Sequence, residues 1–237
     1  MRTIKNILTL AERPIGRQTY GRLFVALAVF TVVAATFMYI AREMIEGETL
    51  PKDTHILLFI NSFSNSSLDK IMLLITTIGD VASVLTVTIA LLALLYWKKR
   101  WQAFALLAFS MAGAAALNIV LKLIFERQRP HLWDLLIHES TYSFPSGHAM
   151  LTSTLVLSLI LIVWNTKWRW AVTGVGILYV VSVGFSRMYL GVHYPTDVAA
   201  GWCVAAVWVI VVASTLGTIN WQAIRTRLSA NRAKSRS

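Results

Sequence analysis

The hydrophobic residues of this chain gather in long runs with almost no formal charge, so the first elements to predict are helices that cross a membrane. A helix needs roughly 20 apolar residues to cross about 30 Å of hydrocarbon. The run at 148–164 is the shortest and is rich in Ser and Thr, but it carries no formal charge after its first residue. We expect six transmembrane helices, at residues 23–41, 71–97, 102–125, 148–164, 171–185 and 197–217.

A seventh apolar run, at residues 56–63, is too short to cross a bilayer. It is more typical of an interfacial or re-entrant segment in the first outer loop. The predicted fold class is therefore all-α, a polytopic membrane protein with six transmembrane helices and a short interfacial segment. We expect one membrane domain over residues 1–237, with basic ends at 1–22 and 221–237.

The composition supports a membrane protein and excludes two other classes. Apolar residues make up 57% of the chain and charged residues 14%, and the mean hydropathy is +0.63. These values are too apolar for a soluble domain of this size. The single cysteine, Cys203, has no partner within the chain, which excludes a disulfide scaffold.

The basic residues predict the orientation of the six spans. An even number of spans places both termini on one side, and the termini with the second and fourth loops hold 15 of the 22 Lys and Arg residues. The positive-inside rule then places both termini in the cytoplasm. The net charge of +11 is explained by this orientation and by attraction to anionic lipids at the inner face. Nucleic-acid binding is not predicted, because no aromatic–basic alternation occurs outside the membrane segments.

Three polar clusters lie at the ends of spans three to six, and by the span count all three face outward. They occupy residues 122–130, 144–148 and 186–197. In the first, Lys122 and Arg129 are seven residues apart and would share a helix face if the helix persisted to just before Pro130. In the third, Arg187 adds a planar, bidentate donor.

The second cluster predicts an anion site at a helix N-terminus. Pro145 suits the first position of a helix, so the free N–H groups of Ser146, Gly147 and His148 would point outward. Backbone N–H groups at a helix start bind anions, and a glycine lets the anion approach closely.

The third cluster pairs a histidine with a carboxylate. His193 and Asp197 are four residues apart, which lets the carboxylate bond one ring nitrogen and leave the other free to attack. Pro195 suits the start of the sixth span. Each residue alone has an ordinary structural explanation, such as a lysine that extends to the interface. Together, the three clusters indicate a phosphate site with a nucleophile and an acid, because charged residues near membrane depth usually serve function.

The pattern Lys-x6-Arg-Pro, Pro-Ser-Gly-His, Ser-Arg-x5-His-x3-Asp resembles the three-part motif of the type 2 phosphatidic acid phosphatase family. That family includes bacterial phosphatidylglycerophosphate and undecaprenyl pyrophosphate phosphatases, lipid A phosphatases, glucose-6-phosphatase and vanadium haloperoxidases. Every motif position is matched between residues 122 and 197, and the six-span layout extends the resemblance to most of the chain.

The resemblance implies a role for each motif residue. His193 would be the nucleophile that forms a phosphohistidine, Asp197 would orient it, and His148 would protonate the leaving oxygen. The residues implied to hold the phosphoryl oxygens are Lys122, Arg129, Ser146, Gly147 and Arg187. The resemblance implies neither metal nor cofactor, and no carboxylate–histidine cluster with metal-ligand spacing accompanies the motifs.

Several charged residues stay outside this predicted site. Asp80, inside the second span, has two open interpretations: a proton or substrate contact, or a capped polar residue between helices. His131 and His138 are expected to be exposed loop histidines. We expect Glu126 and Arg127 to pair with each other or with solvent.

The predicted function is hydrolysis of a lipid phosphate, in the inner (cell) membrane, at an active site on the outer, periplasmic or extracellular face. Undecaprenyl pyrophosphate, phosphatidate and phosphatidylglycerophosphate remain open as substrates, since each presents a phosphate at the same depth. Two alternatives remain open: a lipid phosphotransferase with the same intermediate, and a non-enzymatic anion transporter. The sequence makes no prediction of oligomeric state.

Overall fold

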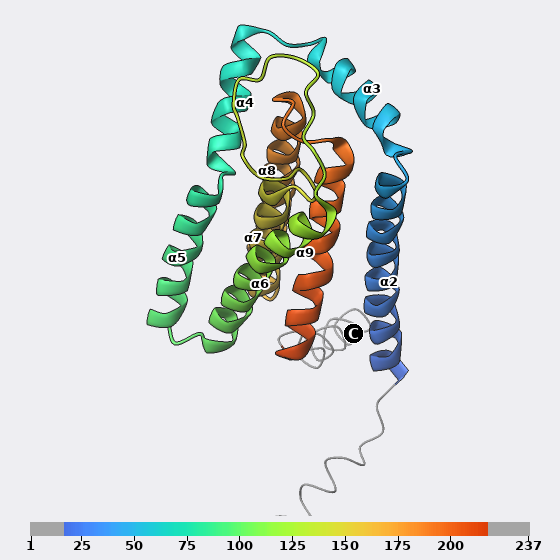
Figure 1. The fold of residues 1–237 in the computed structure, drawn as a ribbon. Coiled ribbons are helices and arrows are strands. Elements are labelled where there is room, and N and C mark those ends of the chain that lie inside the picture. The colour runs from blue at the N-terminus through green and yellow to red at the C-terminus, as the bar shows by residue number, and fades with distance from the viewer. Residues whose placement is uncertain (1–16, 218–237) are drawn as a thin grey trace, which may run out of the picture. The chain divides into compact units, whose positions relative to one another are not determined.

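The computed structural model describes residues 17–217, and every regular element in that part of the chain is a helix (Figure 1). This confirms the all-α class. Of the predicted basic ends, residues 1–16 and 221–237 lie outside the described residues. The helices are α2 (Arg17–Ile45), α3 (Thr49–Asn61), α4 (Ser66–Ile78), α5 (Val81–Trp97), α6 (Trp101–Phe125), α7 (Gly147–Val163), α8 (Arg169–Tyr189) and α9 (Pro195–Thr215).

The chain divides into two units. One consists of Val33–Ile219, and the other of Met1–Val32 with Asn220–Ser237. The core and the site described below belong to the first unit. Of the second unit, the structure describes only the N-terminal part of α2. The single domain expected over residues 1–237 remains a prediction.

Four described helices are long and apolar enough to cross a membrane: Leu27–Ile45, Trp101–Phe125, Arg169–Tyr189 and Pro195–Thr215. A fifth span results if α4 and α5, which bend by 42° at their junction, cross as one broken helix. The helix α7 is apolar but has only 17 residues. The described chain is therefore a multi-pass membrane protein, and the count of six spans remains a prediction.

The span predicted over 71–97 is not one continuous helix, because the chain breaks at Gly79 and Asp80. Gly79 ends α4, and Asp80 caps α5 by accepting the N–H of Ala82 at 3.3 Å. A short carboxylate that bonds nearby backbone N–H groups favours such a helix start over the interior of a helix. A Cβ at Gly79 would lie 2.5 Å from the side chain of Val183, so this break packs closely against α8.

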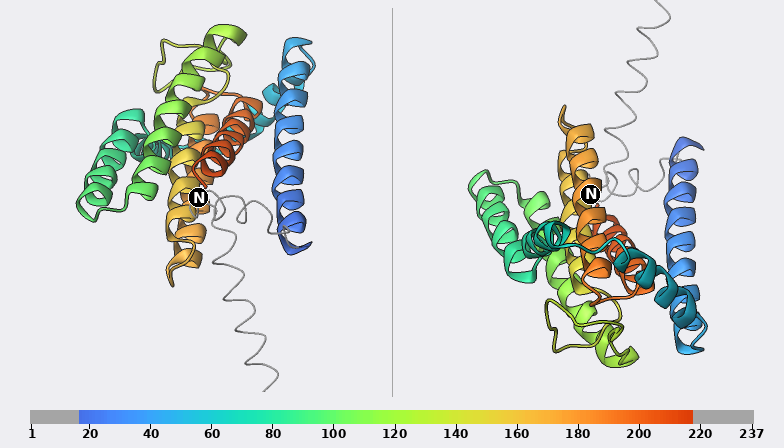
Figure 2. Two further views of the ribbon diagram at one scale, coloured as in Figure 1. Left: turned by 90° about the horizontal axis from the view of Figure 1, so that it is seen from below. Right: turned by 90° about the horizontal axis from the view of Figure 1, so that it is seen from above.

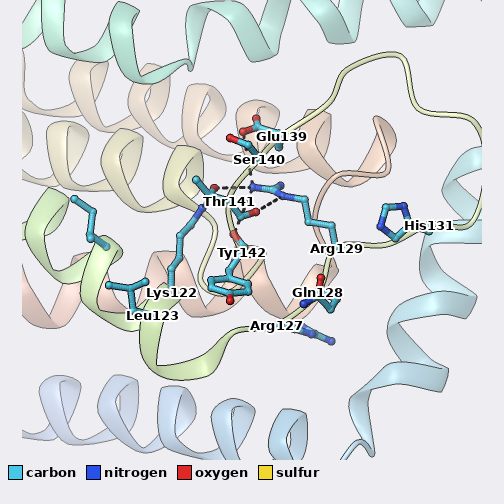
Figure 3. Close-up of a pocket in the computed structure, with 11 residues that line it drawn as sticks. Lys122, Leu123, Arg127, Gln128, Arg129, His131, Glu139, Ser140, Thr141 and Tyr142 are labelled. Atoms are coloured by element: carbon cyan, nitrogen blue, oxygen red, sulfur yellow. Dashed lines mark hydrogen bonds and ion pairs between the residues drawn. The ribbon is translucent and has the colours of Figure 1, made fainter.

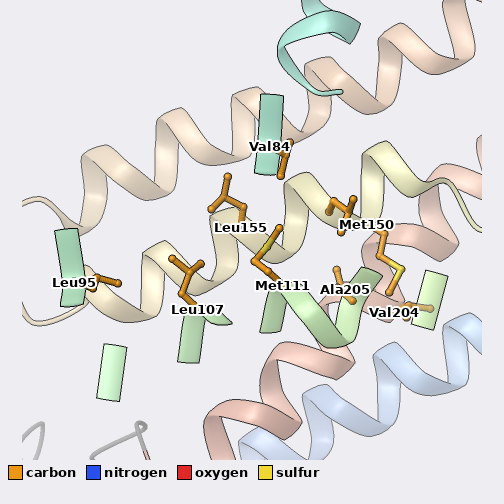
Figure 4. Packing of buried hydrophobic residues seen from close by; sticks show 10 residues of the cluster. Val84, Leu95, Leu107, Met111, Met150, Leu155, Val204 and Ala205 are labelled. Carbon is orange, nitrogen blue, oxygen red and sulfur yellow. The ribbon is translucent and has the colours of Figure 1, made fainter. Parts of the chain in front are cut away.

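The helix α7 packs against α6, α8 and α9 and is enclosed by them (Figure 1). Two of its buried hydroxyls bond its own backbone: Thr152 donates to the carbonyl of His148 at 2.7 Å, and Thr154 to that of Met150 at 2.8 Å. The buried hydroxyls of Ser153 and Ser158 have no hydrogen-bond partner in the described part of the chain, so the helix satisfies only half of the hydroxyls that it buries. The largest apolar cluster surrounds it, with Val84, Leu95, Leu107, Met111, Met150, Leu155, Val204 and Ala205 (Figure 4).

Close packing brings the start of α7 against α9. A Cβ at Gly201 would lie 2.8 Å from the carbonyl oxygen of Ser146, so only glycine permits this approach. At the same end, α3 packs against α8 and α9, and α4 packs against α8 (Figures 1 and 2). The fold thus gathers the C-termini of α6 and α8 and the N-termini of α7 and α9 at one end, beneath α3.

Candidate active site

The three polar clusters, which are separate in the sequence, meet at this end of the bundle. Lys122 lies in the last turn of α6, and Arg187 in the last turn of α8. His148 lies in the first turn of α7, and Asp197 in the first turn of α9. The prediction that the three clusters face one side is therefore confirmed by the structure.

His193 and Asp197 form a buried pair between α8 and α9. The Nδ1 of His193 lies 3.5 Å from Asp197 Oδ2, and the two side chains are 1% and 0% exposed. The distance is long for a hydrogen bond, but the carboxylate is fixed, since its Oδ2 accepts the N–H of Tyr194 at 2.8 Å. Pro195 occupies the first turn of α9, as predicted. Gly191, at φ +71°, turns the chain from α8 toward His193.

The other ring nitrogen of His193 faces cations. Its Nε2 lies 3.1 Å from Arg129 Nη1. Burial lowers the pKa of His193 well below its usual value, and the charges of Arg129, Arg187 and Lys122 lower it further. The imidazole is therefore neutral at pH 7, and its Nε2 lone pair faces the Arg129 guanidinium, which can only donate.

Lys122 and Arg129 meet through Thr141 rather than along one helix face (Figure 3). Lys122 Nζ donates to Thr141 Oγ1 at 2.8 Å, and Arg129 Nε donates to the Thr141 carbonyl at 2.7 Å. The prediction of a helix to just before Pro130 is wrong, because α6 ends at Phe125. The loop that follows carries Arg129 back over the site, where its Nη1 also donates to the carbonyl of Val192 at 2.7 Å.

A cavity of about 550 Å³ opens beside these cations (Figure 3). One anion already faces them, since Glu139 accepts from Arg187 and lies 3.8 Å from Arg129. Burial alone would raise the pKa of Glu139, but the two guanidinium groups lower it below its usual value. A carboxylate therefore stands between two of the cations predicted to hold phosphate. The cavity is lined by Ile119, Lys122, Leu123, Arg127, Gln128, Arg129, His131, Glu139, Ser140, Thr141 and Tyr142.

The start of α7 differs in detail from the prediction. Pro145 precedes the helix, Ser146 is its N-cap residue, and α7 begins at Gly147. The N–H of Ser146 is not free, because it donates to the backbone carbonyl of Asp197 at 3.0 Å. This bond instead ties the N-terminus of α7 to that of α9, and so holds His148 near the His193–Asp197 pair.

Comparison with known proteins identifies the family. The family model described as the PAP2 superfamily matches residues 103–221, half of the chain. The chain belongs to the PAP2 superfamily. The matched residues include all three motifs and the helices that present them.

Relatives within the PAP2 superfamily include two phosphatases. The chain is 36% identical over 121 residues to the undecaprenyl-diphosphatase of Sulfolobus acidocaldarius, covering 49% of this chain and 56% of that one. It is 35% identical over 143 residues to phosphatidylglycerophosphatase B of Bacillus subtilis, covering 56% and 68%. The crystal structure of a transmembrane PAP2-type phosphatidylglycerolphosphate phosphatase from Bacillus subtilis superposes with a TM-score of 0.73 at 27% identity, over 80% of this chain and 96% of that one.

The PAP2 motif does not include Asp80, but the structure places it at the site. Its Oδ1 lies 3.4 Å from His148 Nε2, and the same side chain caps α5. Asp80 is thus a helix cap that also contacts a motif histidine, and its role as a proton or substrate contact stays a prediction. His131 and His138 are both exposed loop residues, as expected, and His131 also lines the cavity.

The prediction for Arg127 is wrong. Its guanidinium does not pair with Glu126 but with two buried carboxylates, Asp197 at 2.5 Å and Asp53 of α3 at 2.8 Å. One signal was available in the sequence: Asp53 is an acidic residue beside the short apolar run 56–63. The sequence analysis also missed Glu139, Thr141 and Ser143, which come from the loop between α6 and α7.

Within residues 17–217, no group of three or more His, Cys, Asp or Glu side chains is placed to hold a metal ion. The charges that face the site are instead the side chains of Lys122, Arg129 and Arg187. Cationic side chains of this kind can stabilise the charge of a phosphoryl group in transfer.

Proposed function

We propose that this protein is an integral-membrane lipid phosphatase that hydrolyses a phosphate monoester or diphosphate of a membrane lipid through a phosphohistidine at His193. The observation that carries the proposal is the setting of that imidazole. It is buried and neutral, with a carboxylate beside Nδ1 and a guanidinium beside Nε2. This is the arrangement that a histidine nucleophile needs for attack on an anionic phosphate.

The first step transfers the phosphoryl group to the protein. The Nε2 lone pair of His193 forms the bond to phosphorus while the bond from phosphorus to the leaving oxygen breaks. His148 donates a proton to that oxygen, and Asp197 offsets the positive charge that develops on the His193 ring. Lys122, Arg129 and Arg187, with the Ser146 hydroxyl and the Gly147 N–H at the start of α7, stabilise the phosphoryl oxygens.

The second step returns the protein to its starting state. Water attacks phosphorus, and the neutral His148 accepts its proton. The bond from phosphorus to nitrogen breaks, free phosphate leaves, and His193 becomes neutral again. The site then needs no other reactant.

The cavity supports a lipid as the bearer of the phosphate. Its walls combine the apolar side chains of Ile119 and Leu123 with the cations Lys122 and Arg129 (Figure 3). Apolar walls suit an acyl or prenyl chain, and the cations suit its phosphate. The phosphate would reach His193 by displacing the carboxylate of Glu139 from the guanidinium groups. Undecaprenyl diphosphate, phosphatidate and phosphatidylglycerophosphate all satisfy this chemistry, and the named relatives support the first and third.

The experiment that tests the function is a phosphate-release panel with detergent-purified protein and these three lipids. We expect free phosphate from at least one of them, and none from phosphatidylglycerol, which lacks a terminal phosphate. Detergent removes the membrane barrier, so release cannot come from transport. Absence of free phosphate from every lipid contradicts the hydrolase, and phosphate recovered only in an added lipid acceptor identifies a phosphotransferase.

We expect catalysis to be independent of metal ions. The three cations and the helix N-terminus already supply the positive charge that a metal would otherwise bring to the phosphoryl group. Turnover should survive excess EDTA and should be blocked by vanadate, which adopts the five-coordinate shape of phosphoryl in transfer. Loss of turnover in EDTA that magnesium restores would contradict this prediction.

We also propose that the protein lies in the inner (cell) membrane with its site outward, both termini cytoplasmic and α3 at the outer interface. The 15 basic residues of the termini and two loops support the orientation. The helix α3 suits an interface because it exposes Ile56, Leu58 and Phe59 while it buries Asp53.

A labelling experiment tests this orientation. In a Cys203→Ala background, His138→Cys in the loop over the site should react with an impermeant thiol reagent in intact cells. Lys98→Cys, which follows the end of α5 farther from the site, should react only after the cells are opened. Both positions are exposed. The reverse pattern would invert the topology.

A further inference from the structure

A second ionic cluster lies against Asp197, on the carboxylate oxygen that does not face His193. Arg127 Nη1 donates to Asp197 Oδ1 at 2.5 Å, and its Nη2 donates to Asp53 Oδ2 at 2.8 Å. The side chains of Arg127, Asp53 and Asp197 are 9%, 2% and 0% exposed. The guanidinium also lies over the Tyr194 ring, 4.1 Å from its centre. One buried cation is thus held between two buried carboxylates.

The two oxygens of Asp197 have different partners. Oδ2 accepts from the Tyr194 N–H and from the Ser143 hydroxyl, and it faces His193 Nδ1. Oδ1 accepts from Arg127. Loss of Arg127 would leave a buried carboxylate without its cation, which is strongly unfavourable. The carboxylate would then rotate or take up a proton, and either change removes the ionised oxygen from His193 Nδ1.

Asp53 extends this cluster from α9 to α3. Its Oδ1 accepts the N–H of Thr196 at 3.2 Å, and its Oδ2 accepts the Thr196 hydroxyl. Thr196 lies in the first turn of α9, where backbone N–H groups have no partner within the helix. Asp53 therefore caps α9 from another helix, and the same carboxylate holds Arg127 in place. Only a planar guanidinium can serve both carboxylates with separate nitrogens, so a lysine cannot replace it.

Arg127 differs from the three cations that face His193. The charges that lower the pKa of His193 most are those of Arg129, Arg187 and Lys122. Both terminal nitrogens of Arg127 are occupied by carboxylates. It is therefore placed to act on Asp197.

We propose that Arg127 and Asp53 are positioning residues of the reaction. They fix the carboxylate of Asp197 so that its Oδ2 keeps the proton of His193 on Nδ1 and leaves the lone pair on Nε2. The inference rests on the proposed phosphohistidine function. It makes α3 part of the catalytic machinery, since the residue that completes the cluster comes from that helix.

Steady-state kinetics on a lipid monophosphate give the first test. Arg127→Gln should lower kcat by about 10²-fold, the loss that a small misplacement of a reacting group produces, with little change in KM. Arg127→Lys should not restore the rate, and Asp53→Asn should lose less than Arg127→Gln. The matched controls are Glu126→Gln and Lys52→Gln, which change exposed neighbours of the two residues and should leave kcat unchanged.

Nitrogen-15 NMR of labelled histidine gives a second test that needs no substrate. The wild-type His193 ring should be a single neutral tautomer with its proton on Nδ1, and Arg127→Gln and Asp53→Asn should each show a mixture. The His193 signals are assigned from their loss in His193→Gln. A structural role alone would alter thermal unfolding but not this tautomer.

The outcomes separate the inference from the proposed function. Wild-type protein that releases no phosphate contradicts the function, and the tautomer measurement still tests the positioning. The inference is overturned if Arg127→Gln retains the kcat of the controls, if its loss lies in KM, or if its tautomer is unchanged. Should Arg127→Gln fail to fold, an unchanged His193 tautomer in Arg127→Lys and Asp53→Asn overturns it equally.

Discussion

Replacement of His193 by alanine should abolish turnover of every lipid phosphate and prevent any phosphoenzyme from forming. The imidazole lies among the charges of Lys122, Arg129 and Arg187, which can hold the phosphoryl group that it attacks. Removal of an enzymatic nucleophile typically costs on the order of 10⁶-fold in kcat, so the residual rate should be undetectable. The measurement is rapid quenching with phosphorus-labelled lipid, followed by a search for an acid-labile, alkali-stable protein phosphate.

Two further variants make this result specific. His193→Gln keeps a polar side chain in the buried position, and it should lose the phosphoenzyme as completely as alanine does. His138→Ala removes an exposed histidine from the loop over the site and should retain wild-type labelling. An acid-labile phosphoenzyme that still accumulates in His193→Ala would show that another residue is the nucleophile.

The sequence predicted the helices best where an apolar run is uninterrupted. The span expected at 102–125 corresponds to α6, Trp101–Phe125, and the span expected at 148–164 corresponds to α7, Gly147–Val163. No end of these two helices differs from its predicted position by more than one residue. The length of an apolar run is enough to predict such a helix, because backbone N–H and C=O groups inside a bilayer must form their hydrogen bonds within the segment. The run at 71–97 is not a single helix, because a local polar group, Asp80, begins a new helix within it.

The short run at 56–63 shows why α3 was only partly predictable. The helix begins earlier, at Thr49, and includes polar residues that face inward. Asp53 is buried because it pairs with Arg127, which is 74 residues away in the sequence. No hydrophobic period can indicate a helix whose buried face includes a carboxylate held by a distant arginine.

The same distinction applies to the site. Spacing within one segment was enough to associate His193 with Asp197, because both lie within a single helix start. Spacing failed for Lys122 and Arg129, whose association depends on Thr141 in a loop that returns over the site. Glu139 was missed for the same reason, since its partner Arg187 belongs to another helix.

The second large effect is expected for His148, and it should depend on the leaving group. His148 lies at the start of α7, 7% exposed, with its Nε2 3.4 Å from Asp80. General acid catalysis typically contributes about 10²–10⁴-fold, so His148→Ala should lose that factor on a lipid monophosphate, whose leaving oxygen is strongly basic. The loss should be smaller for an aryl phosphate, or for a diphosphate whose leaving group is itself a phosphate, because these groups need little protonation.

This substrate dependence distinguishes an acid from a residue that merely binds phosphate. A lost binding contact would affect all substrates alike, since each presents the same phosphoryl oxygens to Lys122 and Arg129. Asp197→Asn serves as the comparison: it keeps the geometry but weakens support for the cationic ring, and its loss should lie between those of the two histidine variants. The measurement is turnover of a lipid monophosphate and an aryl phosphate by His148→Ala, His193→Ala and Asp197→Asn. Equal losses on both substrates in His148→Ala would show that another group protonates the leaving oxygen.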